Sequence, residues 1–174
     1  MASTANQIAL GDVIAIRGKG LLSTLISGVS GIVSHVGIVT ATGDNYADID
    51  VTQALEKVST LSLVQTLAHA KFGYCLHCND LAYGDRVTIA TYALSRLGKA
   101  YPYSNLAWQL MKQVTGNPKW TEYLDSDTNE ICSELASDAY MKVGRDFGVA
   151  PRDCTPSDCF RYAIASPNWQ TFQL

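Results

Sequence analysis

The 174-residue sequence predicts a single α+β domain in which a curved antiparallel sheet carries helices. Short β-branched runs bounded by glycines and turn residues fill the first half of the chain, which is typical of strands joined as hairpins. Runs with helical spacing of apolar residues dominate the second half. Hydrophobic residues make up 47% of the chain and charged residues 17%, so the chain has enough apolar surface to bury a core.

The strand predictions start at residues 12–17 (DVIAIR), a β-rich run entered and left through glycines. Residues 34–40 (SHVGIVT) form a second β-branched run, and the turn at residues 42–45 (TGDN) follows it. The remaining strand candidates are residues 46–54, 57–63 and 71–78. Together these segments predict an antiparallel meander.

The helix predictions rest on apolar spacing and on glycine stop signals. Short helices are expected at residues 21–29 and 63–70, and a longer helix is expected from Asp85 to the stop at Gly98. Six apolar residues are expected to form one face of that longer helix: Val87, Ile89, Ala90, Ala93, Leu94 and Leu97. Two further helices are predicted at residues 103–114 and 131–143.

Charge and hydropathy exclude several classes of function. The formal net charge of −3 leaves no broad basic face, so we expect no nucleic-acid partner. No stretch approaches the roughly 20 apolar residues that span a bilayer, and the first residues lack the basic and apolar regions of a signal peptide. We therefore expect a protein synthesised in the cytoplasm, with delivery to the periplasm or release by lysis left open.

Five cysteines form an odd set, so at least one thiol is unpaired within the chain. Cys75 and Cys78 have a C-x-x-C spacing, but they fall on a predicted strand, where residues three apart point to opposite faces. This placement argues against a metal or redox pair at these two residues. The sequence leaves open whether Cys154 and Cys159 form a disulfide.

Cys132 lies at the predicted start of the last helix, behind a polar run at residues 125–130. The N-terminus of a helix presents unpaired N–H groups and a partial positive charge, which favour a thiolate over a thiol. The same N–H groups can stabilise the oxyanion of an acyl-transfer intermediate. Cys132 is therefore the candidate nucleophile, and a small buried cysteine is the alternative interpretation.

A nucleophilic thiolate needs a group that donates a proton to the leaving group, and histidine has the suitable pKa. The chain has three histidines, at positions 35, 69 and 77. His35 lies within the apolar run SHVGIV, where a polar ring requires a specific partner. We therefore predict His35 as the general base, with a satisfied core histidine as the alternative.

The order of several motifs resembles the YiiX/YebB-like branch of the NlpC-type cysteine hydrolases, a permuted papain-like superfamily related to the lecithin:retinol acyltransferase group. The motifs SHVGIV and CSEL carry most of the resemblance, with histidine before cysteine in the permuted order. The other matching motifs are GDVIAIRG, VTQALEKVSTLSL, RLGKAYPY and TPSD. The resemblance covers roughly residues 10–160 and implies a permuted papain-like fold with Cys132 as nucleophile and His35 as base.

The resemblance also implies a third polar residue on the strand after the histidine strand, which orients the imidazole. The matching position here is Gln53, where the family often has Glu or His. Asp48 and Asp50 are the alternatives, although a regular strand would turn both away from Gln53. Further candidates for the oxyanion or substrate site are Tyr101, Tyr103 and Ser133.

The sequence therefore predicts a cysteine hydrolase that cleaves amide bonds through a thioacyl-enzyme, without a metal or an organic cofactor. The resemblance favours a peptide or peptidoglycan stem as substrate. One alternative is an acyl-lipid hydrolase or acyltransferase, and exposure of residues 21–29 would favour it. A second alternative is an inactive binding module of the same fold, which the neutral Gln53 favours. The scissile bond, the oligomeric state and any inhibitor stay open.

Overall fold

A six-stranded antiparallel sheet forms the centre of the protein in a computed structural model that describes residues 4–19, 32–100 and 131–174. The strand order across the sheet is β4-β3-β2-β1-β5-β6. The strands are β1 (Val13–Gly18), β2 (His35–Ala41), β3 (Asp50–Ala54), β4 (Val58–Ser62), β5 (Ala70–Cys78) and β6 (Trp169–Gln173). Since β2, β3 and β4 are sequential neighbours, the predicted meander is confirmed on that side of the sheet.

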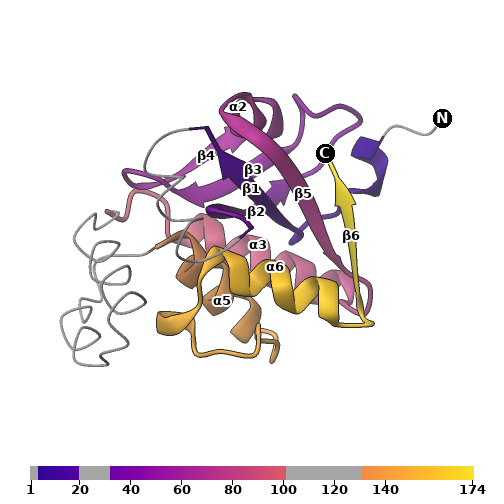
Figure 1. Ribbon diagram of the computed structural model, residues 1–174, viewed down its shortest axis with the longest axis vertical. Coiled ribbons are helices and arrows are strands. Elements are labelled where there is room, and N and C mark those ends of the chain that lie inside the picture. The colour runs from indigo at the N-terminus through magenta and orange to yellow at the C-terminus, as the bar shows by residue number, and fades with distance from the viewer. Residues whose placement is uncertain (1–3, 20–31, 101–130) are drawn as a thin grey trace.

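Helices lie on both sides of this sheet (Figure 1). The described helices are the 3-10 turns η1 (Thr4–Gln7) and η3 (Pro151–Asp153), and the α-helices α2 (Leu63–Ala68), α3 (Tyr83–Ser95), α5 (Cys132–Met141) and α6 (Pro156–Ala165). The three long helices α3, α5 and α6 share one side, and the short helix α2 lies on the other. The α+β class predicted from the sequence is confirmed.

Alternation along β1 divides the core into two clusters. Val13 and Ala15 pack with apolar residues of α3, α5 and α6, whereas Ile14 and Ile16 pack with Leu63 of α2 and the N-terminal residues. Because the first four residues of β1 are buried and point alternately to the two faces, they form a continuous apolar run in the sequence.

The predicted apolar face of α3 is partly wrong. Ile89, Ala90 and Ala93 are buried, whereas Val87 and Leu94 are 37% and 41% exposed, as is Leu97 beyond the helix at 48%. The helix also begins at Tyr83, two residues before the predicted start. The buried stripe is therefore narrower than the sequence pattern suggested, because three small or branched residues fill the space against the sheet.

One further predicted element differs from the structure in extent, two predicted helices are untested, and two observed elements were not predicted. The strand expected at residues 46–54 covers only Asp50–Ala54, because the residues before it lie in a turn where Asn45 Nδ2 donates to Asp48 Oδ2 at 3.0 Å. The helices expected at residues 21–29 and 103–114 fall outside the described residues. Helix α6 and strand β6 had no counterpart among the predicted elements. Within the described residues, no helix is long and apolar enough to cross a membrane.

Candidate active site

The imidazole of His35 and the amide of Gln53 meet on adjacent strands. His35 opens β2, and Gln53 of β3 pairs with Gly37, so the two side chains are diagonal neighbours on the same face. The distance between His35 Nε2 and Gln53 Oε1 is 2.7 Å. The glycine between them matters, because a Cβ at position 37 would lie 3.0 Å from the Cβ of Gln53.

Thr66 fixes the orientation of the Gln53 amide. Gln53 Nε2 donates to Thr66 Oγ1 at 3.0 Å, and both side chains are buried. The amide nitrogen is therefore used by Thr66, which leaves the amide oxygen to accept the Nε2 proton of His35. Thr66 itself is held in α2, a short helix that starts with a reciprocal capping box between Ser62 and Gln65.

Cys132 is the first residue of α5, with Ile131 at the N-cap. Its thiol lies within hydrogen-bonding reach of the His35 ring and of the backbone N–H groups of Val36 and Ser133. Since Nε2 of His35 is bonded to Gln53, the other ring nitrogen, Nδ1, is the one available to the sulfur. Strand β2 thus supplies both the histidine and a backbone donor to the same sulfur.

The electrostatics of the pair favour a thiolate and an imidazolium. Burial of Cys132 disfavours the thiolate, but the charge and hydrogen bond of His35, with the two backbone donors, hold the pKa of the Cys132 thiol below its ordinary value. For His35, burial would lower the pKa, whereas the charge of Cys132 and the hydrogen bonds to Cys132 and Gln53 raise it above its ordinary value. Both shifts point to an ion pair between the two side chains.

The other predicted site residues separate into three groups. Ser133 is buried, its backbone N–H faces the Cys132 sulfur, and its Oγ donates to the carbonyl oxygen of Cys154 at 2.6 Å. Asp48 lies in the turn before β3, and Asp50 opens that strand, so Gln53 is the residue among the three that contacts His35. Tyr101 and Tyr103 lie outside the described residues.

Replacing Gly37 with alanine is expected to destabilise the protein by about 1–3 kcal/mol, because the added methyl overpacks the sheet. Its Cβ would lie 2.6 Å from Val51 Cγ1 as well as close to Gln53. Gly84→Ala on α3 is the matched control, since a Cβ there meets nothing within 4 Å. Urea unfolding of both variants measures the difference, and equal stabilities would contradict the close approach.

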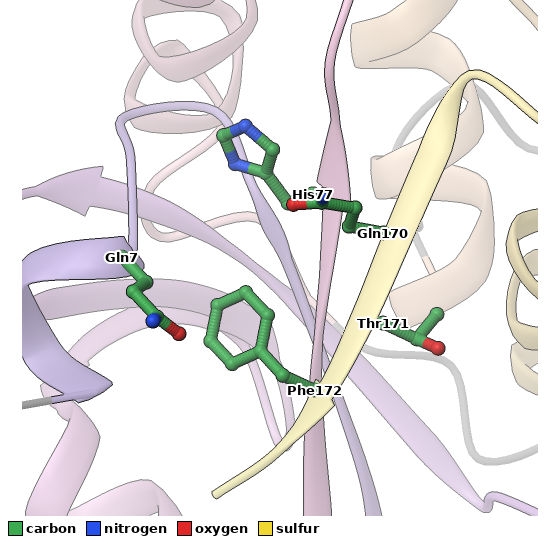
Figure 2. Close-up of a pocket in the computed structure, with 5 residues that line it drawn as sticks. All are labelled: Gln7, His77, Gln170, Thr171 and Phe172. Atoms are coloured by element: carbon green, nitrogen blue, oxygen red, sulfur yellow. The ribbon is translucent and has the colours of Figure 1, made fainter.

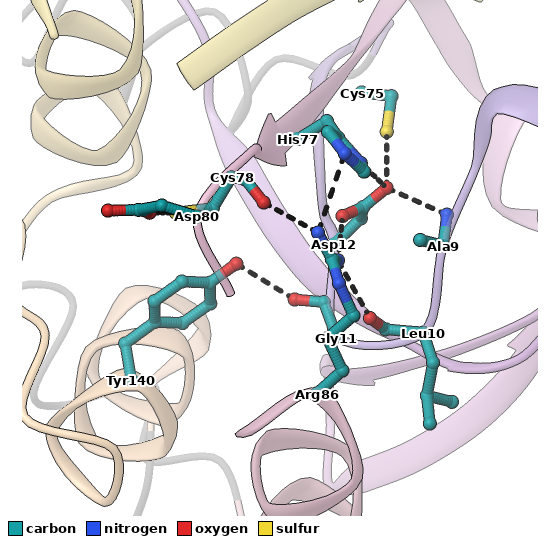
Figure 3. A network of polar contacts seen from close by, with 10 residues as sticks. All are labelled: Ala9, Leu10, Gly11, Asp12, Cys75, His77, Cys78, Asp80, Arg86 and Tyr140. Atoms are coloured by element: carbon teal, nitrogen blue, oxygen red, sulfur yellow. Dashed lines mark hydrogen bonds and ion pairs between the residues drawn. The ribbon is translucent and has the colours of Figure 1, made fainter. Parts of the chain in front are cut away.

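A second polar cluster surrounds Asp12, the residue directly before β1, whose side chain is fully buried (Figure 3). Its Oδ1 accepts from Arg86 Nη1 at 2.9 Å, and its Oδ2 accepts from His77 Nδ1 at 2.9 Å and from the backbone N–H of Ala9 at 2.8 Å. Arg86 also donates to the carbonyl oxygen of Leu10 at 3.1 Å. No motif in the sequence predicts this cluster, because Asp12 and Arg86 are 74 positions apart.

The hydrogen-bond donors of the Arg86 guanidinium determine which ring nitrogen of His77 carries a proton. Arg86 Nη2 lies 3.4 Å from His77 Nε2 and carries only hydrogens to donate, so Nε2 is an acceptor and Nδ1 carries the proton. His77 also borders a surface pocket of about 530 Å³ lined by Gln7, His77, Gln170, Thr171 and Phe172 (Figure 2). Neither Cys132 nor His35 lines this pocket. The cluster therefore ties the segment between η1 and β1 to β5 and α3 as a structural centre.

No group of three or more His, Cys, Asp or Glu residues in the described parts of the chain could hold a metal ion. Asp12, His77 and Cys75 do approach one another, and Cys75 Sγ lies 3.5 Å from Asp12 Oδ2. However, the guanidinium of Arg86 already forms an ion pair with the Asp12 carboxylate. A metal ion bound to that carboxylate would be repelled by this fixed positive charge. The cluster thus does not fit a metal.

Neither a known family model nor a curated protein sequence matches this chain. At the level of architecture, the chain shares an α+β fold with proteins of solved structure. One of these is the metalloprotein yiiX from Escherichia coli O157:H7 (DUF1105), with a TM-score of 0.70 and 18% sequence identity. The matched region covers 95% of this chain and 97% of that one. At this identity, the likeness shows a common fold alone.

Proposed function

We propose that this protein is a cysteine hydrolase of the permuted papain-like type, with Cys132 as nucleophile, His35 as general base and acid, and Gln53 as the residue that orients His35. The observation that carries the proposal is the contact of Cys132 with a histidine whose other ring nitrogen is bonded to Gln53 at 2.7 Å. Thiol catalysis requires a nucleophile that contacts a base, and a third group that orients the base. A buried structural cysteine needs none of these contacts.

The chemistry follows from the two pKa shifts. The thiolate of Cys132 attacks the carbonyl carbon of an amide, and the imidazolium of His35 donates its Nδ1 proton to the leaving amine. In this proposal the backbone N–H of Ser133, at the N-terminus of α5, stabilises the oxyanion; its contact with the Cys132 sulfur supports that role. Neutral His35 then removes a proton from water, which hydrolyses the thioacyl-enzyme and restores the ion pair.

For the substrate, we propose amide bonds of peptidoglycan stem peptides. The support is the motif resemblance, in which SHVGIV and CSEL occur in permuted order. The protein would then act on the cell wall, after delivery to the periplasm or release by lysis. An acyl-lipid substrate would use the same nucleophile and base, so the substrate test has to separate the two.

Digestion of purified peptidoglycan sacculi by the wild type and by Cys132→Ala tests the proposal. Mass spectrometry of the released fragments is expected to show new stem-peptide ends with the wild type alone. Release by Cys132→Ala would contradict the assignment of the nucleophile. If the wild type releases nothing while Cys132 still reacts selectively with iodoacetamide, the substrate assignment is wrong and acyl-lipids are the next class to test.

If Gln53 positions His35, variants of Gln53 and of its partner Thr66 should lower kcat by different amounts. Gln53→Leu removes the hydrogen bond that a neutral amide accepts from the charged ring of His35, and it is expected to lower kcat by about tenfold or more, with KM little changed. Thr66→Val should give a smaller loss, because the amide keeps its oxygen but loses its anchor. The pH dependence of kcat distinguishes this role from a general loss of stability, since only an orienting residue shifts the profile.

A further inference from the structure

Two buried thiols meet where the chain enters α6. The sulfur atoms of Cys154 and Cys159 are 3.5 Å apart, and both residues are fully buried. Both cysteines are free, as are the three others. Neither belongs to the proposed catalytic group, so the chemistry of this pair is independent of the proposed function.

The local sequence explains this contact. Thr155 is the N-cap of α6, and its Oγ1 accepts from the backbone N–H of Asp158 at 3.2 Å. The Asp158 carboxylate in turn accepts from the backbone N–H of Thr155 at 2.9 Å, and Pro156 occupies the first helical position. This capping box places the residue before the cap, Cys154, against the fourth residue of the helix, Cys159.

Apolar side chains at these two positions commonly pack as a hydrophobic staple. A pair of thiols differs from an apolar pair in that it can be oxidised. A disulfide requires a sulfur–sulfur distance of about 2.05 Å, so the two sulfurs need to approach by only roughly 1.5 Å. The short segment between them is closed by the capping box in the reduced protein already, which limits the rearrangement needed.

We propose that Cys154 and Cys159 are a reversible disulfide site that is oxidised by exchange with a small disulfide of the glutathione type. In the first step, the Cys154 thiolate attacks one sulfur of the oxidant, forms a mixed disulfide and releases one glutathione thiolate. In the second step, Cys159 gives up its proton to that thiolate, attacks the Cys154 sulfur and releases the second glutathione. The second glutathione leaves as a thiolate and takes up from the solvent the proton that Cys154 lost on forming its thiolate, so two protein thiols are oxidised and one small disulfide is reduced to two thiols.

The order of the steps follows from the surroundings of Cys159. Its hydrogen bond with Cys154, its burial and the nearby negative charges raise the pKa of the Cys159 thiol well above its ordinary value. Cys159 therefore keeps its proton, which leaves Cys154 as the sulfur that reacts first. Access to Cys154 requires local opening of the adjacent turn η3, where Arg152 and Asp153 are exposed.

The site lies directly behind the N-terminus of α5. The carbonyl oxygen of Cys154 accepts the hydrogen bond from Ser133 Oγ at 2.6 Å, and Ser133 follows the proposed nucleophile. Cys132 is itself close enough for its charge to raise the pKa of Cys159. For this reason the test removes the Cys132 thiol, so that any disulfide found must involve the other four cysteines.

Trypsin digestion leaves Cys154 and Cys159 on the same peptide, residues 153–161 (DCTPSDCFR). Cys75 and Cys78 also share one peptide, residues 72–86, and provide an internal control. These two residues lie on opposite faces of β5, because Cys75 and Cys78 belong to different core clusters. The folded Cys132→Ala protein is incubated with oxidised glutathione, denatured, alkylated with iodoacetamide and digested.

The proposal predicts that peptide 153–161 loses two hydrogens and carries no label, that dithiothreitol restores two labels, and that peptide 72–86 carries two labels throughout. In a Cys132→Ala, Cys159→Ser variant, glutathione should remain bound to Cys154. Double labelling of peptide 153–161 after oxidation would overturn the proposal, as would a persistent mixed disulfide on that peptide. Equal oxidation of peptide 72–86 would overturn it as well, since it would show exchange in an unfolded chain.

Discussion

The His35→Ala variant is expected to lose turnover by about 10⁴-fold or more, which is the loss that removing the general base of such a catalytic group produces. The ring of His35 supplies the charge that favours the Cys132 thiolate, and it also supplies the proton for the leaving group. Its removal therefore affects both nucleophile and acid. The loss is measured as the turnover of the peptidoglycan bond that the digestion of sacculi identifies as the substrate.

The same variant should change the pH dependence of Cys132 alkylation. The thiolate is the reactive form and is present above the pKa of the thiol. In the wild type this pKa is held below its ordinary value, so alkylation persists as the pH falls. Without His35, burial of the thiol dominates, the pKa rises, and the midpoint of the alkylation profile moves to higher pH.

His69→Ala is the matched control for His35→Ala. His69 is exposed at the C-terminal end of α2 and is not among the groups that shift the pKa of Cys132. This variant should keep wild-type turnover and a wild-type alkylation profile. A His35→Ala protein with an unchanged profile would show that the lowered pKa of Cys132 has another source.

The Arg86→Met variant is expected to lose about 3–5 kcal/mol of unfolding free energy, because it leaves a buried carboxylate without its positive partner. Asp12 is fully buried and the Arg86 side chain is 10% exposed, so water cannot replace the lost contact. His77 remains hydrogen-bonded to the second carboxylate oxygen, so the variant removes the guanidinium but keeps this contact. Urea unfolding monitored by circular dichroism measures the effect.

Two further variants separate loss of charge pairing from loss of packing. Arg145→Met breaks the ion pair with Asp80, in which both side chains are partly exposed, and should cost less than about 1 kcal/mol. The double variant Asp12→Asn, Arg86→Met removes both buried charges and should be more stable than Arg86→Met alone. A double variant less stable than Arg86→Met would show that the buried charge is not the cause.

The sequence predicted the α+β class, four of the strands and the start of the helix at Cys132 closely, because alternation and helical spacing report burial directly. Helix α6 was missed although its capping box, Thr155 to Asp158 with Pro156 at the first position, is visible in the sequence. Strand β6 gives a weaker signal. It is an edge strand whose residues are at most half-buried, so no burial pattern marks it.

The candidate site was predictable in part. His35 and Cys132 stand in distinctive motifs, and Gln53 followed from the motif order. Thr66 carries no comparable signal, because a hydroxyl on a short helix gains its role only when α2 packs over β3. The pairing of Asp12 with Arg86 joins residues 74 positions apart, and periodicity cannot report such a contact.

Site-resolved alkylation of the native protein with iodoacetamide at pH 6 tests the central claim most directly. All five cysteines are buried, so burial alone gives none of them an advantage. Burial and hydrogen bonds raise the pKa of Cys75, Cys159 and Cys78, the last to about 12, whereas the pKa of Cys132 is lowered. The tryptic peptide 120–142, which contains only Cys132, should therefore be labelled much faster than the peptides 72–86 and 153–161. Equal labelling of the three peptides, or no labelling of peptide 120–142, would contradict the assignment of Cys132 as an activated nucleophile.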